Sequence, residues 1–373
     1  MKSGKAINNK QNKTLITGIG LSVIVLCAGV SLGSSGINPT ETIRALAEKI
    51  LRLNLNVDPH IAAIVWELRL PRTILAFIVG GSLAVSGAVF QSVLKNQLAS
   101  PYILGVSSGA SLGAALVMLG FSGSISGLLG NAIFSAPLGF LGLFIMPLTG
   151  FVFGLGTVLV VIAFAYRLDK NLSNNTIILF GMVFSLFVNA ILTTLLSVFH
   201  EELKNLLLWQ LGSFSLRGWN HVALILPFFV LGLLGIIRYI KEMDILSFGE
   251  DEGRAMGVNA KAVRKRLFLF ASLLTGASVA LCGAIGFVDL IAPHAVRRIA
   301  GSRHSWVIPL SFLAGGILMV TADIIARIAA SPSELPVGAV TALIGAPFFA
   351  WVYFGKTPGS AFSKSIFTRR SQR

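Results

Sequence analysis

Long apolar stretches recur from one end of this chain to the other, and they limit the possible folds more than any other feature. An α-helix needs about 17–25 mostly apolar residues to cross the hydrocarbon core of a bilayer, and these stretches reach that length. They predict membrane-spanning helices at Thr14–Leu32, Thr73–Leu94, Ile103–Leu119, Ala136–Tyr166, Thr176–Phe199, His221–Ile237, Leu267–Ile285, Ser305–Ala326 and Val337–Phe354. The expected fold class is therefore an all-α polytopic membrane protein.

The composition supports spans rather than a soluble core. Apolar residues make up 54% of the 373 residues and charged residues 12%, whereas a soluble domain carries about 25% charged residues. We expect a tail at 1–13, a transmembrane domain at 14–354 and a second tail at 355–373. The basic first tail resembles a secretory signal, yet no small-residue cleavage site closes the first apolar stretch, so we expect a retained span.

A shorter apolar stretch, Val288–Ala300, carries Asp289, Pro293 and His294, and we expect a short or broken helix there. It brings the total to about ten membrane helices. With a cytoplasmic N-terminus, this even number places most of the 30 Lys and Arg residues on the cytoplasmic side, as the positive-inside rule requires. Both termini are then cytoplasmic, and the net charge of +15 needs no nucleic-acid partner.

Two eight-residue segments, Ser82–Val89 and Ser278–Ile285, share serine, alanine, glycine and alanine at matching positions. The spans that contain them are expected to cross the bilayer in opposite directions. Inverted internal repeats of this kind are common in transporters, whose pathway lies between the two halves. A chance match between two small, apolar helices remains the alternative.

The longest cytoplasmic connection, 238–266, contains the segment Ser247–Asn259. A serine followed by acidic residues suits a helix N-terminus, Gly257 suits a helix C-terminus, and a basic second helix is predicted from Ala260. Two short amphipathic helices at the membrane surface favour a docking site for a cytoplasmic partner. A solvated loop is the simpler interpretation of the same charges.

This loop resembles the L-G-E/D-E-x-A-x-x-L-G-V segment through which permeases of the FecCD type contact their ATPase. Such permeases belong to the type II ABC importers for iron siderophores, haem and cobalamin. Further segments match the family in its own order and extend from about Ile61 to Phe354: Leu68–Thr73, Leu104–Ala110, Gly283–Phe287, Pro293–His294, Ala322–Arg327 and Glu334–Gly338. Together these motifs are highly specific.

The resemblance implies a permease subunit of an ABC importer, in a bacterial or archaeal cell membrane, that translocates an iron chelate (siderophore or haem) or cobalamin. It implies ABC ATPase subunits, an extracytoplasmic substrate-binding protein and a second, identical or homologous permease subunit as partners. The chain is expected to be no enzyme and to bind no cofactor, with ATP used by the separate ATPase. Gly355–Thr357 resembles the end of a phosphate-binding loop, but Ala350 stands where the first glycine is required.

In this family, outward-facing arginines receive acidic residues from the two lobes of the binding protein. The matching residues are Arg69, Arg72 and Arg327, and the predicted topology puts all three at the outer ends of spans. The alternative for each is an arginine that extends its charge from a helix end to the membrane interface.

The family's cytoplasmic gate corresponds to Asn96 and Leu98 after the second span, and to Ser173, Asn174 and Asn175 at the start of the fifth. Capping of the fifth span by Ser173 or Asn174 explains the second group equally well. The residues expected to couple to the ATPase are Gly249, Glu250, Asp251, Glu252, Gly253, Arg254, Gly257, Val258 and Asn259.

Three residues depart from the family pattern: Gln97 replaces the usual proline, Gly253 the usual alanine and Asp289 the usual glycine. They leave the geometry of the gate and the details of coupling open. We expect Asp289 to cap the short helix, and Asp323 to pair with Arg327 one helical turn later.

The sequence predicts no metal site, because no histidines and cysteines stand together at metal-ligand spacing. His294 is expected to be a core residue, and Cys27 and Cys282 to be packing residues. The alternative function is an ion-coupled secondary transporter that uses Asp289 or Asp323. An intramembrane enzyme would need facing catalytic groups on neighbouring spans, and no such pair is evident. The cargo stays open among siderophore, haem, cobalamin and oxyanion.

Overall fold

The computed structural model describes residues 2–33, 37–52, 55–121, 139–170, 173–201 and 203–354, and no strand occurs among them. The longer helices are α1 (Lys2–Ser31), α4 (Leu70–Val93), α5 (Val106–Phe121), α8 (Gly139–Leu168), α9 (Asn174–Val198), α11 (Trp219–Ile237), α14 (Ala260–Cys282), α16 (His304–Ile328) and α17 (Val337–Phe354). The shorter ones are α2 (Pro39–Leu51), α3 (Pro59–Ala63), the π-helix η1 (Ile64–Arg69), the 3-10 helix η2 (Pro101–Leu104), α10 (Lys204–Gln210), α12 (Ile240–Phe248), α13 (Glu250–Ala255) and α15 (Val288–Ala300).

Seven helical stretches of the described chain are long and apolar enough to cross a membrane, and α5 and α17 are shorter apolar helices. Each apolar stretch predicted from the sequence coincides with a helix, and α15 and α17 have the predicted bounds. The all-α polytopic class is confirmed. The tail predicted at 355–373 and the first residues of the fourth predicted span lie outside the described residues.

Two helices extend further than the sequence predicted. Helix α1 begins at Lys2, so the residues expected to form a tail continue the first span as helix. The basic helix does begin at Ala260, but it is the start of the long span α14 rather than a separate short helix. No proline interrupts either segment, so helix formation, once nucleated, continues through the polar residues into the apolar ones.

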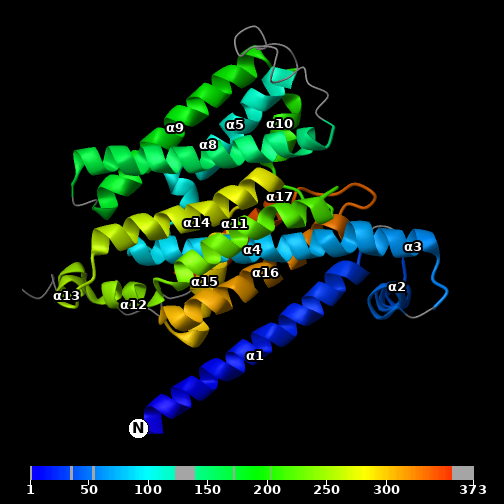
Figure 1. Ribbon diagram of the computed structural model, residues 1–373, viewed down its shortest axis with the longest axis horizontal. Helices are drawn as coiled ribbons and strands as arrows, with labels where there is room; N and C mark the ends of the chain where they lie inside the picture. The colour runs from blue at the N-terminus through cyan, green and yellow to red at the C-terminus, as the bar shows by residue number, and fades with distance from the viewer. Residues whose placement is uncertain are drawn as a thin grey trace, which may run out of the picture.

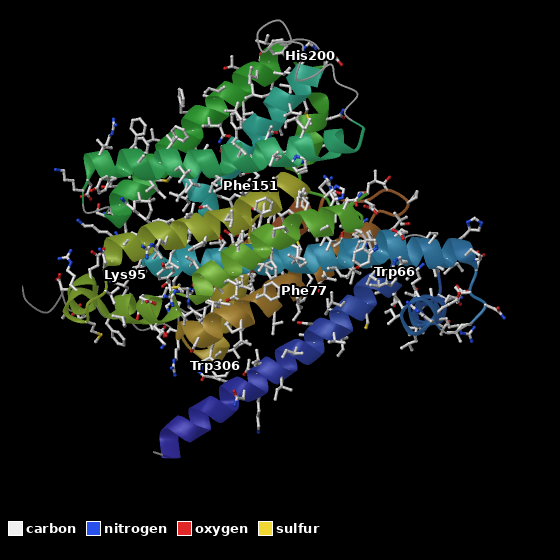
Figure 2. The ribbon with its side chains drawn as sticks, in the orientation of Figure 1. Trp66, Phe77, Lys95, Phe151, His200 and Trp306 are labelled. Atoms are coloured by element: carbon white, nitrogen blue, oxygen red, sulfur yellow. The ribbon has the colours of Figure 1, made fainter. Side chains whose placement is uncertain are left out.

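Helix α4 is the centre of the molecule, with α16, α14, α15 and α11 packed around it. Helices α5, α8 and α9 form a second layer beyond α14, and α1 runs diagonally along the opposite side (Figure 1), in contact with α16. The rod formed by α3, η1 and α4 runs from Trp66 at one end of the molecule towards Lys95 at the other (Figure 2). We call these the arginine end, after Arg69 and Arg72, and the Lys95 end.

Glycines let α4 and α16 approach each other closely. A Cβ added to Gly80 would lie 2.3 Å from the Gly315 carbonyl oxygen, so no side chain fits there. On either side, Phe312 covers Gly81 and Phe77 covers Gly316, and the two rings meet edge to face at 5.5 Å. Close approach through small residues is how helices associate tightly where water provides no driving force.

Helices α4 and α14 are antiparallel, as the predicted repeat requires. Ser86 of α4 accepts a hydrogen bond from Thr275 of α14 at 2.7 Å, while Phe90, one turn further along α4, packs on the earlier Phe268. The two matching segments are not identical in conformation. Residues 82–89 are helical throughout, whereas α14 ends at Cys282, inside the second segment.

The break after α14 is caused by Gly283, whose φ of 79° is left-handed and whose Cβ would lie 2.1 Å from the Trp209 carbonyl oxygen. The chain re-enters helix at α15, which rests on α4 where Gly87 leaves room for the Asp289 backbone. The prediction that Asp289 caps α15 is wrong. Phe287 occupies the cap position with a φ of 72°, which moves Asp289 into the first turn.

Candidate functional site

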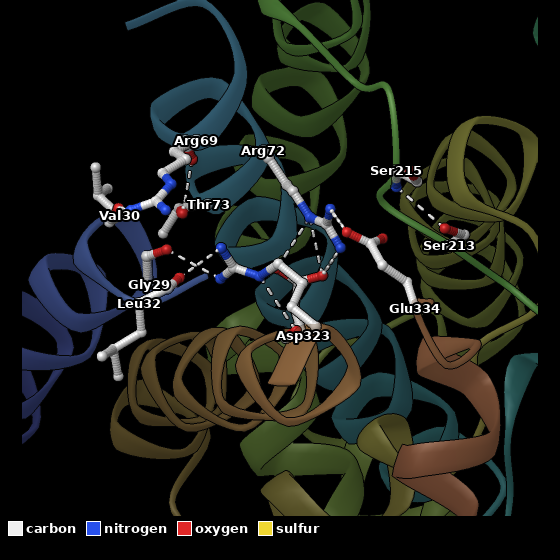
Figure 3. A network of polar contacts seen from close by, with 11 residues as sticks. Gly29, Val30, Leu32, Arg69, Arg72, Thr73, Ser213, Ser215, Asp323 and Glu334 are labelled. Carbon is white, nitrogen blue, oxygen red and sulfur yellow. Dashed lines mark hydrogen bonds and ion pairs between the residues drawn. The ribbon is translucent and has the colours of Figure 1, made fainter. Parts of the chain in front are cut away.

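Three arginines predicted as a docking site converge at the arginine end of the molecule, and Figure 3 shows two of them, Arg69 and Arg72. Arg69 ends the π-helix η1, Arg72 lies in the first turn of α4, and Arg327 lies in the last turn of α16. They are buried, with exposed fractions of 3–9%. They are therefore not isolated charges that extend into solvent from helix ends.

Asp323 holds two of these arginines together. Its carboxylate lies 2.7 Å from the Arg72 guanidinium and 3.1 Å from that of Arg327, and Arg72 also pairs with Glu334 at 2.9 Å. The predicted pair between Asp323 and Arg327 is confirmed. The partners of Arg72 could not be found from the sequence, because they lie more than 250 residues away along the chain.

The same arginines complete the C-terminal end of α1. Arg69 donates to the carbonyls of Val30 and Ser31, at 3.2 and 2.8 Å. Arg327 donates to those of Gly29 and Leu32, at 2.9 and 2.8 Å. The last four carbonyls of a helix lack intrahelical partners, and positive charge is favourable at that end. The arginine cluster therefore fastens α1 to α4 and α16.

A cavity of about 280 Å³ opens on this cluster, and we call it the arginine pocket. Arg69, Arg72 and Arg327 line it together with Arg217 from the loop before α11, while Glu334 is the one carboxylate among its lining residues. Positive charge thus exceeds negative charge around the cavity. The sequence interpretation did not include Arg217, which belongs to none of the matched motifs.

At the Lys95 end, the two predicted gate segments lie side by side. The Asn174 amide donates to the Leu94 carbonyl at 2.9 Å, just ahead of the first segment. In that segment the Asn96 side chain accepts from the backbone N–H of Leu98 at 2.9 Å. Asn96, Leu98, Ser173 and Asn175 are exposed and Asn174 is half-buried. Exposed side chains from both segments are therefore gathered in one place.

The capping alternative for this region is only partly correct. Ser173 occupies the N-cap position of α9, but its hydroxyl makes no capping bond to the helix backbone. It lies 2.9 Å from the Thr176 hydroxyl instead. Asn174 is used across the two segments rather than as a cap.

Helix α15 anchors the residues that follow the first gate segment. The Ser100 hydroxyl donates to the buried carboxylate of Asp289, and the Tyr102 hydroxyl donates to the Ile285 carbonyl at 2.9 Å. Burial raises the pKa of Tyr102 above its ordinary value, so it remains a protonated donor. The predicted gate loop is thus connected to the break between α14 and α15, a connection that the sequence did not indicate.

The connection 238–266, which contains the predicted coupling residues and which we call the coupling segment, forms two short helices, α12 and α13, at the Lys95 end (Figure 1). Ser247 lies in the last turn of α12, so the prediction that it starts a helix is wrong. Gly249 precedes α13 instead, with a φ of 157° that a bulkier residue adopts with difficulty. Gly257 follows α13 with a φ of 78°, as expected for a helix end, and Asn259 caps α14 through Ala262.

The coupling segment packs against the rest of the protein on one side and is exposed on the other. Glu250 pairs with Arg264 of α14, and Gly253 is buried where its Cβ would lie 2.8 Å from Leu246. This contact explains why glycine is accommodated at that position. Phe248 and Met256 are 78% and 65% exposed, so the segment presents apolar side chains outward between acidic ones.

Helix α12 is also attached to α16. The Asp244 carboxylate lies 2.6 Å from the His304 ring and accepts from its backbone N–H at 2.8 Å. His304 begins α16, the helix that carries Asp323 and Arg327 at its other end. One continuous helix therefore joins the coupling segment to the arginine cluster.

The described residues contain no group of three or more His, Cys, Asp or Glu that could hold a metal ion. His294 is half-buried, with its ring 6.1 Å from that of Phe349. Cys27 and Cys282 are free thiols.

Seven apolar helical stretches of the described chain long enough to cross a bilayer, packed around the central helix α4, define the class of protein: a polytopic membrane protein. The FecCD transport family matches residues 21–354, and the chain belongs to this family.

The chain is 35% identical over 347 residues to an uncharacterised ABC transporter permease protein, YvrB of Bacillus subtilis, covering 93% of this chain and 94% of YvrB. It is 35% identical over 335 residues to the cobalamin import system permease protein BtuC of Halobacterium salinarum, covering 90% and 84%. Its fold matches a solved metal-chelate type ABC transporter in an inward-facing conformation with a TM-score of 0.76, at 28% identity, covering 92% of this chain and 99% of that one.

Proposed function

We propose that this chain is the membrane-spanning permease subunit of an ABC importer that carries an iron chelate or cobalamin, delivered by a substrate-binding protein. The observation that carries the proposal is the family match across residues 21–354, which includes both ends of the transport path. The metal-chelate and cobalamin transporters among its relatives support these two classes of cargo.

The proposed topology has ten membrane helices, with α15 as the short eighth and both termini in the cytoplasm. The Lys95 end is then cytoplasmic and the arginine end faces outward. The excess of Lys and Arg on the first side supports this orientation. The antiparallel arrangement of α4 and α14 supports the inverted repeat.

We place the separate ATPase at the coupling segment. Phe248 and Met256 supply exposed apolar contact area, and the acidic residues Asp251 and Glu252 are exposed between them. ATP hydrolysis belongs to that partner and not to this chain. A second permease subunit would complete the pathway.

We expect conformational changes during transport to pass along a series of direct contacts between helices. The ATPase moves α12, and the contact between Asp244 and His304 passes the motion to α16. At the other end of α16, Asp323 and Arg327 belong to the cluster that lines the arginine pocket. The binding protein, docked there through acidic residues, is thereby linked to α12 and the ATPase.

The function is tested in proteoliposomes that contain the permease, its ATPase and its binding protein. We expect uptake of a ferric siderophore, haem or cobalamin that requires both ATP and the binding protein. Uptake driven by an ion gradient with this chain alone would favour the alternative, a secondary transporter. Asp323 is unsuited to ion coupling, because two arginines already neutralise it.

The docking assignment needs a test that separates binding from folding, since Arg69 and Arg327 also hold α1. Charge reversal at both positions should abolish uptake that depends on the binding protein. Reversing the facing acidic residues of the binding protein should then restore part of it. Unimpaired uptake by the double reversal would rule out docking at these arginines.

A further inference from the structure

We propose that the loop Ser213–Gly218, between α10 and α11, is a second docking element for the binding protein, with Leu216 as an apolar anchor and Arg217 as a receptor for an acidic side chain. This inference rests on the proposed function. It concerns residues outside the three arginines that the family resemblance indicates.

The exposure of Leu216 is the first observation. Its side chain is 88% exposed, more than any other large apolar residue in the described part of the chain. Leu216 lines the arginine pocket together with Leu68, which is 52% exposed. A lipid-facing leucine would lie along the side of a span, whereas these two flank a cavity lined by charged groups.

The backbone of Leu216 is the second observation. Its φ of 56° is left-handed, a conformation that is uncommon for residues other than glycine, asparagine and aspartate. Such conformations persist only where the surroundings impose them, and they are concentrated at functional sites. An exposed leucine in this conformation is not explained by packing, because its side chain packs against little.

The loop is held rigidly on both sides of Leu216. Ser213 donates its backbone N–H to the Cys282 carbonyl at 2.9 Å, and the hydroxyl of Ser213 accepts from the N–H of Ser215 at 3.0 Å. Phe214 is fully buried between them, and the Trp219 indole donates to the Trp66 carbonyl at 2.9 Å. A loop that is already fixed loses little backbone entropy when a partner binds it.

Charge decides what the pocket accepts. Arg217 shares a hydrogen bond with His221 at 3.0 Å, but its Nε is buried without a hydrogen-bond partner among the described residues. Four guanidinium groups face two carboxylates, the lining Glu334 and the buried Asp323 behind it, so a net positive charge remains and the pocket suits an anion. The pocket volume of about 280 Å³ is of side-chain size. The occupant that fits is therefore an acidic side chain of the partner, next to an apolar recess in the partner that covers Leu216.

The loop also touches the parts of the molecule that the transport cycle would move. Gly212, directly before it, accepts a hydrogen bond from Val337 at the start of α17, at 3.0 Å, and Ser213 contacts the end of α14. Docking on this loop would therefore reach the break at Gly283 as well as the start of α17.

The test measures binding of the cargo-loaded, fluorescently labelled binding protein of the same system to the permease–ATPase complex in lipid nanodiscs. Leu216→Ser and Arg217→Gln should each weaken binding about 10-fold or more, as loss of an interface hot spot does. Leu216→Met should retain most of the affinity. Leu168→Ser is the matched control, since Leu168 is a 70% exposed leucine at the C-terminal end of α8, just before the segment that contacts Leu94 at the Lys95 end. This variant should bind as wild type does.

Several outcomes would overturn the inference. If Leu216→Ser and Arg217→Gln bind like wild type while the wild-type complex binds normally, the loop is not a docking element and the proposed function stands. If the two variants keep their affinity for the binding protein but lose bound anionic lipid, the arginine pocket is a site for lipid headgroups. If the wild-type complex binds no binding protein, both the inference and the proposed function fail. Unchanged thermal midpoints of the variants would exclude misfolding as the cause of a loss.

Discussion

Asp323 is a single buried residue that determines the role of the arginines around it. It is fully buried, and both Arg72 and Arg327 contact its carboxylate. Removing ions from water costs several kcal/mol each unless close partners compensate. These three residues therefore depend on one another, and the two arginines have a structural role in addition to any role in docking.

Replacing Asp323 with alanine should destabilise the protein by about 3–5 kcal/mol, because Arg72 and Arg327 stay buried without their carboxylate. A lower midpoint of thermal unfolding in detergent would show this. Glu334→Gln is the control, since the Glu334 side chain is 28% exposed and its loss should cost about 1 kcal/mol or less. Equal midpoints for the two variants would contradict the buried network.

Asp289 is a second residue whose role comes from its contact. Its carboxylate is 1% exposed and accepts from Ser100, directly behind the gate loop. Where the family resemblance leads us to expect glycine, this chain thus has a link between α15 and the predicted gate loop.

Ser100→Ala and Asp289→Gly should both loosen the gate loop, because each removes that link. The measurement is the rate at which a membrane-impermeant maleimide labels a cysteine placed at Leu98, with exposed Cys27 replaced by serine. We expect faster labelling in both variants and no further increase when they are combined. Rates equal to those of the parent would mean that the link does not restrain the loop.

At the scale of elements, small residues decide which helices can touch. The contact between α4 and α16 depends on Gly80 and Gly315, where backbone meets backbone. Gly87 plays the same part between α4 and α15. The central helix thus carries glycine on the faces where its neighbours approach most closely.

Gly80→Ala should destabilise the protein by about 1–3 kcal/mol, the usual cost of overpacking, because its Cβ would lie 2.3 Å from the Gly315 carbonyl oxygen. Gly156→Ala in α8 is the matched control, since nothing lies within 4 Å of a Cβ there. It should be neutral or slightly stabilising. Thermal unfolding of both variants decides, and an unaffected Gly80→Ala protein would refute close packing of α4 on α16.

The connection between α12 and α16 belongs to the same scale. Asp244→Ala removes both contacts to His304, so the coupling segment would move without pulling α16. We expect ATP hydrolysis by the assembled transporter to continue while uptake per ATP falls severalfold. A variant in which hydrolysis and uptake fall together would show a defect in ATPase binding instead.

The whole molecule has two chemically different ends. Helices α12 and α13 lie at one end, and α2 and α3 lie at the other (Figure 1), where η1 and the start of α4 carry Arg69 and Arg72. Exposed Met256 and Leu216 mark these ends. In the proposed topology, the first faces the cytoplasm and the second faces outward.

Single cysteines at Met256 and Leu216, in the background without Cys27, test this orientation. In intact cells, an impermeant maleimide should label position 216 and spare position 256, and inverted membrane vesicles should give the opposite pattern. Labelling of both positions from the same side would refute the topology. The Lys95→Cys variant is expected to show the same labelling pattern as Met256→Cys, because residue 95 lies at the same end of the molecule (Figure 2).

The sequence by itself determined the class of protein, the positions of the helices and the family. Apolar length is a local property, so the bounds of α15 and α17 could be predicted without any knowledge of packing. The same holds for the pair of Asp323 and Arg327, which are one helical turn apart.

Only the tertiary structure decided which distant residues meet. It buries Arg72 against Asp323 and Glu334, attaches α1 through its last carbonyls, and connects Ser100 to Asp289. It also placed Phe287 rather than Asp289 at the cap of α15, because a left-handed backbone precedes that helix. These contacts depend on how helices approach in three dimensions, and no periodicity along the chain encodes the distance between residues 72 and 323.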